Sequence, residues 1–477
     1  MDKLKIVVLG AGPAGLSCAW KLAEAGYEVV VLEKEDQVGG ICRTIRRGDY
    51  LFDLGGHRFI TKDEELGRVI QELMADELLT TPRKSVIRLR GKYFQYPLEL
   101  KNLFFNMDKL FLIESMCDYI YSVVSKRLLN KQDASFEDWV VNRFGRALYN
   151  VYFGVYTEKL WGISPKQISA DWAAQRISLL NLWDVLTRLA GKESNRPKTY
   201  ALEFAYPKAG IGRISDRMRE EIEKNGGKII LGAKVNKIFL DDVKIKKVGY
   251  QHGGELKDIS ADWIVSSIPI NEFIGSMDPA PRPEYAQAAK AMRFRAVRFL
   301  NLIVDAEEVT DNTWMYIPEK SFLFFRIQEP KNWSRASAPA GKTSLILEIA
   351  CNPGDEIATA PEEIIFDRCK KDLDKLGLFD TSKIREYFTT YVEHGYPIYD
   401  LTYKDKVAGA TRLLKSISNL VPIGRQGLFR YNNMDHSIKM GFLAAEHILH
   451  GGMETRIFSI ASESVAFEIE KNLEKRI

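Results

Sequence analysis

A polar run near the end of the chain holds the densest group of side chains that could do chemistry. Residues 424–437, GRQGLFRYNNMDHS, carry two arginines, a tyrosine, two asparagines, an aspartate and a histidine. An apolar stripe of helical spacing follows directly, made of Ile438, Phe442, Ala445 and Leu449. We predict a helix that begins near Ser437 and aims its N-terminus at a ligand, because the free N–H groups of a helix start bind anionic or electron-rich groups.

A second group of candidate residues is a glycine pattern at the N-terminus. A buried-strand pattern at residues 4–9, LKIVVL, leads into Gly10, Gly12 and Gly15 and then into a helical pattern. The next apolar strand, EVVVLEK, contains Glu33 near its end. Strand, GxGxxG, helix, strand and acid in this order predict a dinucleotide-binding fold, in which the glycines admit a pyrophosphate and pack the helix. Glu33 would then accept hydrogen bonds from a ribose.

Two further glycine pairs distinguish between nicotinamide and flavin dinucleotides. In sequence order they and the charged residues beside them are Gly39, Gly40, Arg43, Gly55, Gly56 and His57. Paired glycines let the backbone lie against a flat cofactor, and Arg43 would balance the pyrophosphate charge. The pattern resembles that of flavoproteins, which implies non-covalent FAD with His57 beside the isoalloxazine ring. The alternative for His57 is a histidine that serves packing only.

Three later segments must come together with this N-terminal unit. Residues 222–238 have the pattern of a helix end, a Gly-Gly turn and a strand, and residues 261–270 that of a further apolar strand. Residues 420–427, LVPIGRQG, predict a strand that ends at Gly424 and Arg425. The cofactor-binding domain is therefore predicted to be assembled from separated parts of the chain.

The order of these parts resembles flavoenzymes of the amine oxidase superfamily. The resemblance implies that the backbone at Val235 contacts the adenine. It also implies that the helix start, with Asp435, His436 and Ser437, faces the N1–C2 carbonyl edge of the flavin, where negative charge gathers on reduction.

Composition places the chain among ordinary globular proteins of two or three domains. Its 477 residues are too many for one compact core, and 45% hydrophobic with 28% charged residues exclude disorder as the main state. A net charge of +4 gives no indication of a nucleic-acid partner. Five cysteines without a CxxC pair indicate neither a zinc site nor a disulfide scaffold, so no metal is predicted and reduced thiols in a cytoplasmic location are expected.

The sequence pattern carries no targeting or membrane-spanning signal. The start, MDKLKIVVLGAG, enters a strand directly, and no stretch reaches the roughly 18 apolar residues of a spanning helix. Residues 103–124 are rich in Phe, Leu, Ile and Tyr but are interrupted by charged residues. We expect a packed amphipathic helix there, with membrane contact as the less favoured alternative.

Several segments resemble the UDP-galactopyranose mutases, in the same order along the chain. They are GGHRFITK, GKYFQYPLELKNL, residues 135–177 and GRQGLFRYNNMDHS, with the shorter WMYIPEKSFLFFRI and HGYPIYD. Parts of them also resemble proteins grouped loosely with protoporphyrinogen oxidase. The chain is thus similar to a UDP-galactopyranose mutase-like flavoprotein within the amine oxidase and protoporphyrinogen oxidase-like superfamily.

The resemblance implies a second anion site. Arg176 and Arg326 fall where the mutases hold the substrate diphosphate, and Tyr396 and Tyr431 fall where two phenols bridge the phosphates. Forked guanidinium donors suit phosphate oxygens, although Arg176 by itself would fit a surface ion pair equally well. One departure is Glu99, which stands where the eukaryotic mutases have a glutamine near the uridine, and it leaves the base undetermined.

The predicted fold class is α/β: a doubly wound, Rossmann-like FAD-binding domain with a helical insertion and a sheet-rich substrate domain. The FAD-binding domain is expected from residues 1–85, 202–280 and 405–477, the helical insertion from 86–201 and the substrate domain from 281–404. Strands are expected at AVRFLNLIV, FLFFRI and TSLILEIA. Trp161 and Trp172 are expected to anchor a core and not to stack on a sugar.

Two functions from different classes fit this pattern. The favoured one is ring isomerisation of a nucleotide-diphosphate sugar between pyranose and furanose forms through N5 of the reduced flavin, with NADPH or NADH as the candidate reductant. Its active-site residues would be His57, Arg176, Arg326, Tyr396 and Tyr431. The alternative is an FAD-dependent oxidoreductase of the amine oxidase superfamily, which would consume an acceptor in each turnover. A protein that holds flavin without catalysis is the least favoured, and the oligomeric state is not predicted.

Overall fold

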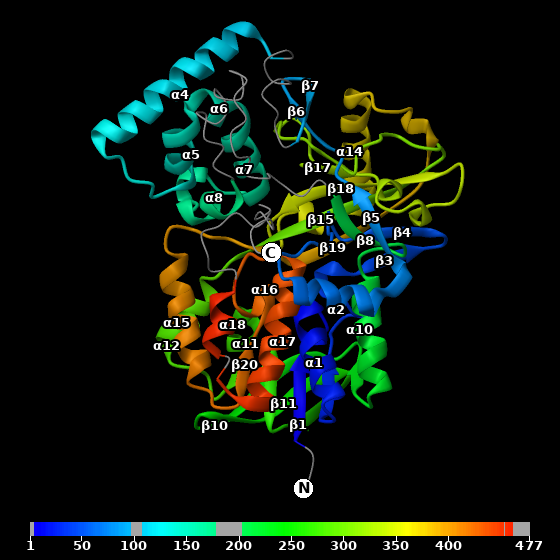
Figure 1. The fold of residues 1–477 in the computed structure, drawn as a ribbon, viewed down its shortest axis with the longest axis vertical. Coiled ribbons are helices and arrows are strands. Elements are labelled where there is room, and N and C mark those ends of the chain that lie inside the picture. The colour runs from blue at the N-terminus through cyan, green and yellow to red at the C-terminus, as the bar shows by residue number, and fades with distance from the viewer. Residues whose placement is uncertain (1–3, 97–106, 178–202, 453, 461–477) are drawn as a thin grey trace, which may run out of the picture.

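The computed structural model describes residues 4–96, 107–177, 203–452 and 454–460 of the 477-residue chain (Figure 1). Glu99, which stands where the eukaryotic mutases have a glutamine, lies outside these residues. Residues 178–202 and 461–477, which belong to predicted domains, also lie outside them. The side chain of Arg176 also lies outside the described part of the structure.

A five-stranded parallel sheet lies in the lower half of the molecule in Figure 1. Its strands, in spatial order, are β20 (Leu420–Pro422), β13 (Trp263–Ser266), β1 (Lys5–Leu9), β2 (Glu28–Leu32) and β9 (Lys228–Ile230). Ile6 and Val8 of β1 enter one core, and Val7 and Leu9 enter another. Both faces of the sheet are therefore buried, which explains the unbroken apolar run of this strand.

The first core includes residues of the helices α1 (Pro13–Glu24), α10 (Arg213–Lys224) and α17 (Met434–His450). Helix α17 begins at Met434 and not near Ser437. Asn433 caps it, and the ring of His436 completes the cap by accepting a hydrogen bond from the Asn433 N–H at 3.4 Å. This reciprocal cap supplies acceptors for N–H groups at the helix start, so the helix begins three residues earlier than predicted.

The second core lies on the other face of the parallel sheet. It includes residues of a four-stranded sheet with the order β12 (Glu255–Ser260), β11 (Lys244–His252), β10 (Lys234–Asp241) and β14 (Met277–Asp278). It also includes residues of α11 (Ile270–Gly275), α12 (Pro283–Lys290) and α15 (Tyr403–Lys415). Because α12 packs against α11 and α15, it lies with the cofactor-binding half, although the predicted boundary at residue 281 assigns it to the substrate domain.

The sheet-rich domain is built on a seven-stranded sheet. Its order is β19 (Ile384–Pro397), β15 (Phe294–Val304), β18 (Thr343–Cys351), β17 (Arg326–Gln328), β16 (Trp314–Tyr316), β6 (Ser85–Leu89) and β7 (Lys92–Gln95). A parallel cofactor sheet with a separate sheet-rich domain confirms the predicted α/β fold class.

Two local predictions for this domain are wrong. Residues 86–95 were expected to begin the helical insertion, but residues 85–95 form a hairpin in the sheet, because Ile87 and Leu89 alternate into a core. In FLFFRI, the strand begins only at Arg326. Phe322 and Phe324 pack into a core, and the carbonyl of Phe324 accepts a hydrogen bond from Lys159 Nζ at 2.6 Å.

The helical region consists of α4 (Lys109–Leu129), α5 (Phe136–Phe144), α6 (Arg146–Leu148), the π-helical turn η3 (Tyr149–Phe153), α7 (Gly154–Trp161) and α8 (Ala170–Arg176). Helix α4 lies at the outer edge of the molecule (Figure 1). Its apolar side is exposed, so the prediction of a packed amphipathic helix at residues 103–124 is wrong for the described part. Among the described residues, no helix is long and apolar enough to cross a membrane.

The remaining strands and α-helices of the described chain are β3 (Thr44–Arg47), β4 (Tyr50–Asp53), α2 (Glu64–Met74), β5 (Leu78–Pro82), β8 (Glu203–Pro207), α13 (Glu356–Thr359), α14 (Glu362–Leu376), α16 (Gly424–Gly427) and α18 (Glu454–Ser459). The short 3-10 helices are η1 (Gly40–Cys42), η2 (Ala75–Glu77), η4 (Pro165–Gln167), η5 (Pro330–Asn332), η6 (Arg335–Ser337) and η7 (Thr381–Lys383). Figure 1 shows α16 and the start of α17 near the middle of the molecule, between the parallel sheet and the strands above it.

Candidate functional site

A cavity lies at the carboxyl ends of β1 and β2, and β19 forms part of its wall. Most predicted cofactor-binding residues line it: Gly10, Gly12, Glu33, Gly40, Arg43, Gly56, His57, Val235, Gly424, Arg425 and Ser437. The others, Gly15, Gly39, Gly55, Asp435 and His436, lie outside its lining. In open α/β sheets, ligands bind at this edge of the strands.

In the loop that carries Gly10, Gly12 and Gly15, a side chain would fit at one glycine but not at another. A Cβ built on Gly15 would lie 2.0 Å from the carbonyl oxygen of Gly10, whose φ of +95° itself favours glycine. A Cβ built on Gly12 would meet no atom within 4 Å. Gly15 therefore serves the packing of α1, whereas Gly12 leaves room for a ligand at the helix N-terminus.

Two charged side chains hold the loop around the end of β2. The buried Glu33 carboxylate accepts hydrogen bonds from the N–H groups of Ala11 at 2.6 Å and Glu35 at 3.0 Å, and burial raises its pKa. A carboxylate has about four acceptor positions, so Glu33 retains capacity for ligand hydroxyls. Arg43 donates to the Gly40 carbonyl at 3.2 Å and pairs with Glu35 at 3.3 Å, which fixes a cation at the cavity wall.

His57 is a neutral imidazole in the wall of the cavity. Burial, followed by the charges of Arg425, Arg326 and Arg58, lowers its pKa to about 3. Its Nδ1 is buried and has no hydrogen-bond partner among the described residues. A buried polar atom without a partner is costly, so this nitrogen is suited to meet a ligand group.

Arg326 is held by a fully buried carboxylate. Its Nε and Nη2 each donate to Glu348 at 2.6 Å, and Gln328 donates to the same carboxylate. Burial by itself would lower the pKa of Arg326, but Glu348 raises it well above its ordinary value. A Cβ built on Gly56 would lie 3.5 Å from Nη1, so the remaining edge of the guanidinium lies against the glycine next to His57.

The two predicted tyrosines form a stacked pair. The ring centroids of Tyr396 and Tyr431 are 5.6 Å apart with an interplanar angle of 19°. The guanidinium carbon of Arg425 lies 5.5 Å and 5.1 Å from these two centroids. Burial, followed by the neighbouring Tyr431, raises the pKa of Tyr396 to about 12, so its phenol is protonated at neutral pH. Two hydroxyl groups and one cation are thus brought together.

Trp161 and Trp172 support this pair from behind. Trp172 meets the ring of Tyr431 edge-on at 4.5 Å, and Trp161 meets Trp172 at 4.7 Å. Both indoles are buried in the second core, as expected for core anchors.

Some residues of the polar run 424–437 line the cavity, and others hold the loop in place. Arg425 faces the cavity and donates to the carbonyls of Gly395 and Asn432, whereas Arg430 donates to carbonyls of α18 and the residue after it, at Phe458 and Ile460. Asn433, Met434 and Ser437 line the cavity. Arg430 therefore holds the loop, and only part of the run faces a ligand.

Three residues near the site were missed by the sequence reasoning. Arg58 and Arg83 lie 5.1 Å and 5.8 Å from the Trp314 ring, which Arg326 approaches at 5.9 Å. No spacing in the sequence marks these two arginines. Glu348 is different, because a lone acid inside the apolar strand TSLILEIA signals a buried partner.

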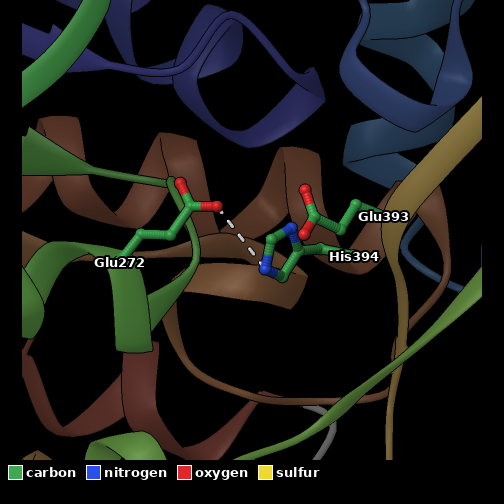
Figure 2. Close-up of side chains that lie close together, drawn as sticks. All are labelled: Glu272, Glu393 and His394. Atoms are coloured by element: carbon green, nitrogen blue, oxygen red, sulfur yellow. Dashed lines mark ion pairs between the residues drawn. The ribbon is translucent and has the colours of Figure 1, made fainter. Parts of the chain in front are cut away.

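The cavity wall also contains a cluster with metal-ligand chemistry. Figure 2 shows the His394 ring between the carboxylates of Glu272 and Glu393, with His394 Nε2 3.5 Å from Glu272 Oε1. One potential ligand atom from each residue lies within 4.8 Å of the others. Burial lowers the pKa of His394, so it is a neutral acceptor at neutral pH. The cluster lies within the same cavity and accepts hydrogen bonds from hydroxyl groups equally well.

The cavity residues fit a flavin dinucleotide: the space at Gly12 suits a pyrophosphate, and the unpartnered Nδ1 of His57 suits a polar ring. Residues 13–404 match the family of flavin-containing amine oxidoreductases. The chain belongs to this family. It is accordingly a flavin-dependent enzyme.

Within this family, the curated relatives include two different chemistries. The probable UDP-galactopyranose mutase of Klebsiella pneumoniae is 25% identical over 176 residues, 36% of this chain and 44% of its own length. The all-trans-retinol 13,14-reductase of Danio rerio is 25% identical over 276 residues, 51% of this chain and 44% of its own length. This chain therefore spans less than half the length of either relative.

A solved structure of reduced UDP-galactopyranose mutase has the same fold. It covers 98% of this chain and 100% of its own with a TM-score of 0.84 at 21% identity. The predicted resemblance to a UDP-galactopyranose mutase-like flavoprotein is confirmed.

Proposed function

We propose that this enzyme interconverts the pyranose and furanose rings of a nucleotide-diphosphate sugar with the help of reduced FAD. The observation that carries the proposal is the dual use of one loop. It contributes Gly424 and Arg425 to the cavity wall and Tyr431 to the aromatic pair. The mutase names of one curated relative and of the solved structure support the same reading.

FAD would be held non-covalently by Gly12 and Arg43 at its pyrophosphate, by Glu33 at a ribose and by Gly56 and His57 at the ring. When bound in its reduced form, it supplies a nucleophilic ring nitrogen. The neutral His57 adds no charge beside the ring, so Arg425 and the N-terminus of α17 are left to balance negative charge there.

The diphosphate would lie against the Tyr396–Tyr431 pair. Glu348 neutralises most of the charge of Arg326. The main contribution of Arg326 is therefore one oriented edge of N–H donors and not a net positive charge. Arg425 supplies the net charge next to the tyrosines. Arg176 ends α8, and its role as a further diphosphate ligand is proposed from the resemblance.

An oxidoreductase acting on another substrate is the second candidate. The family name and the retinol reductase relative favour it. The two candidates share the cofactor residues and differ in what happens to the electrons.

Reductant stoichiometry distinguishes them. The protein is reduced with dithionite, NADPH or NADH under nitrogen and mixed with UDP-, GDP- or dTDP-sugars, and the products are separated by chromatography. A mutase forms many equivalents of a ring isomer while the flavin stays reduced. An oxidoreductase gives an oxidised or reduced product in step with a change in the flavin spectrum, and that result would refute the mutase proposal.

The Tyr431→Phe variant, which keeps the cavity lining, is expected to lower turnover without loss of flavin.

A further inference from the structure

Helix α4 presents its apolar side outward. Nine of its large apolar side chains are between 39% and 78% exposed: Leu110, Ile113, Met116, Ile120, Tyr121, Val123, Val124, Leu128 and Leu129. At 3.6 residues per turn, most of these side chains share one half of the helix surface. Figure 1 shows no described element on the outer side of α4.

The inward side of the same helix is mostly polar. Phe111, Ser115, Ser122 and Ser125 are buried, and Asp118 accepts a hydrogen bond from the Ala147 N–H at 2.6 Å. The small serines let α4 lie close to α5 and α6. The polarity of α4 is therefore the reverse of that of a helix whose apolar side packs on its own domain.

Cations stand at both ends of the apolar side. Lys109 and Arg127 are exposed and lie on the same side of the helix, about 27 Å apart along its axis. Lys131 follows the helix, and its Nζ lies 5.9 Å from the exposed Tyr121 ring. Glu114 is the exposed acid of the helix and falls at the margin of the apolar side.

This charge pattern selects the kind of partner. Two copies of the chain joined through this side, parallel or antiparallel, would place the cations of one against the cations of the other. An anionic lipid surface instead receives the apolar side chains in its acyl boundary and the end cations at its headgroups. We propose that the outward side of α4 docks the enzyme onto anionic membranes, with the helix axis in the membrane plane.

Vesicle flotation of the full-length, flavin-loaded protein tests the proposal. The protein is expected to float with vesicles that contain one third phosphatidylglycerol and much less with pure phosphatidylcholine, and added salt should release it. The Ile120→Glu variant and the Lys109→Glu/Arg127→Glu variant should each lower binding by roughly tenfold or more.

Matched controls change equally exposed positions elsewhere. Leu256→Glu, on β12 at 75% exposure, and Lys228→Glu/Lys290→Glu should bind vesicles like the wild type. Equal binding by the α4 variants and these controls would refute the proposal, as would no binding of the wild type to anionic vesicles.

Cys117 offers a second measurement, because it is exposed on α4 while the other four cysteines are buried. A polarity-sensitive fluorophore on Cys117 should shift to the blue with anionic vesicles only. A thiol that resists labelling without vesicles would show that residues 178–202 or a second copy cover the helix. Light scattering separates these two cases, and either one overturns the proposal.

Discussion

At the scale of residues, burial sets the protonation state of His57. Its pKa is about 3 in the folded protein against 6.5 for an exposed histidine. The unfolded chain therefore takes up a proton between these values that the folded protein does not, so stability falls as the pH falls through this window. The His57→Gln variant should gain about 1.4 kcal/mol relative to the wild type for each pH unit below 6.5. Denaturant unfolding across this range measures the gain.

Asp53 provides the control with the opposite sign. Burial raises the pKa of this carboxyl from 3.8 to about 6, so its ionisation costs stability as the pH rises through that window. The Asp53→Asn variant should therefore gain on the wild type with rising pH. Slopes of the same sign in the two variants would contradict one of the two assignments, and the sign itself shows which one.

Arg326 combines a structural charge with a proposed ligand contact, and the two can be separated. Arg326→Ala leaves the fully buried Glu348 without its ion-pair partner and should cost about 3–5 kcal/mol of stability. Arg326→Ala/Glu348→Gln should recover most of that loss of stability.

Both variants should bind UDP to the reduced protein about 2–4 kcal/mol more weakly while retaining flavin. Arg412→Ala, on α15, is the exposed control. UDP affinity that recovers in the double variant would show that Arg326 touches no ligand.

At the scale of elements, two glycines at the start of α1 have different roles: Gly12 leaves space for a ligand, and Gly15 allows close packing. Gly12→Val should fold with nearly unchanged stability and lose flavin, because its side chain enters open cavity space. Gly15→Val should lose about 3 kcal/mol or more, because its Cβ meets the Gly10 carbonyl. Flavin absorbance of the purified proteins and thermal unfolding separate the two effects. Flavin retained by Gly12→Val would contradict the cofactor site.

Helices α1 and α17 meet through a second glycine. A Cβ on Gly441 would lie 2.0 Å from Ser17 Oγ and 2.4 Å from the Ala14 carbonyl oxygen. Gly441→Ala should therefore cost about 1–3 kcal/mol, although alanine is the better helix former. Gly275→Ala, which meets no atom within 4 Å on α11, should change stability by less than about 0.5 kcal/mol. Denaturant unfolding of both variants measures the difference.

At the scale of the whole molecule, buried contacts join segments that lie far apart in the sequence. Lys159 Nζ donates to the carbonyls of Ile317 and Glu319 at 2.9 Å and of Phe324 at 2.6 Å. Burial lowers its pKa to about 7. The backbone N–H of Tyr431 donates to the Tyr399 hydroxyl at 2.8 Å, so the segment that follows β19 holds the ligand loop.

Removal of the cofactor should loosen this assembly. A ligand at about a thousand times its dissociation constant stabilises the folded state by about 4 kcal/mol. The apoprotein should therefore unfold at a lower temperature than the flavin-loaded protein, and added FAD should restore the transition. An unfolding temperature that does not respond to FAD would refute binding in the cavity.

Local pattern was enough to predict the parts whose geometry is set by nearby residues. Gly10, Gly12, Gly15 and Glu33 lie within one strand–helix–strand unit, where a steric rule and a short spacing fix the turn. The start of α17 was predicted within three residues, because helical period is a local property while the cap at Asn433 depends on its reciprocal bond with His436.

Only the tertiary structure decided which elements meet. Residues 85–95 joined the substrate sheet because β16, far along the chain, offered a strand edge, and Glu348 was placed on Arg326 by the pairing of β17 with β18. Helix α4 has the same apolar period whether that side is buried or exposed. Its orientation was decided by its neighbours, because the serines and Asp118 fit against α5 and α6 and leave the larger apolar side chains outside.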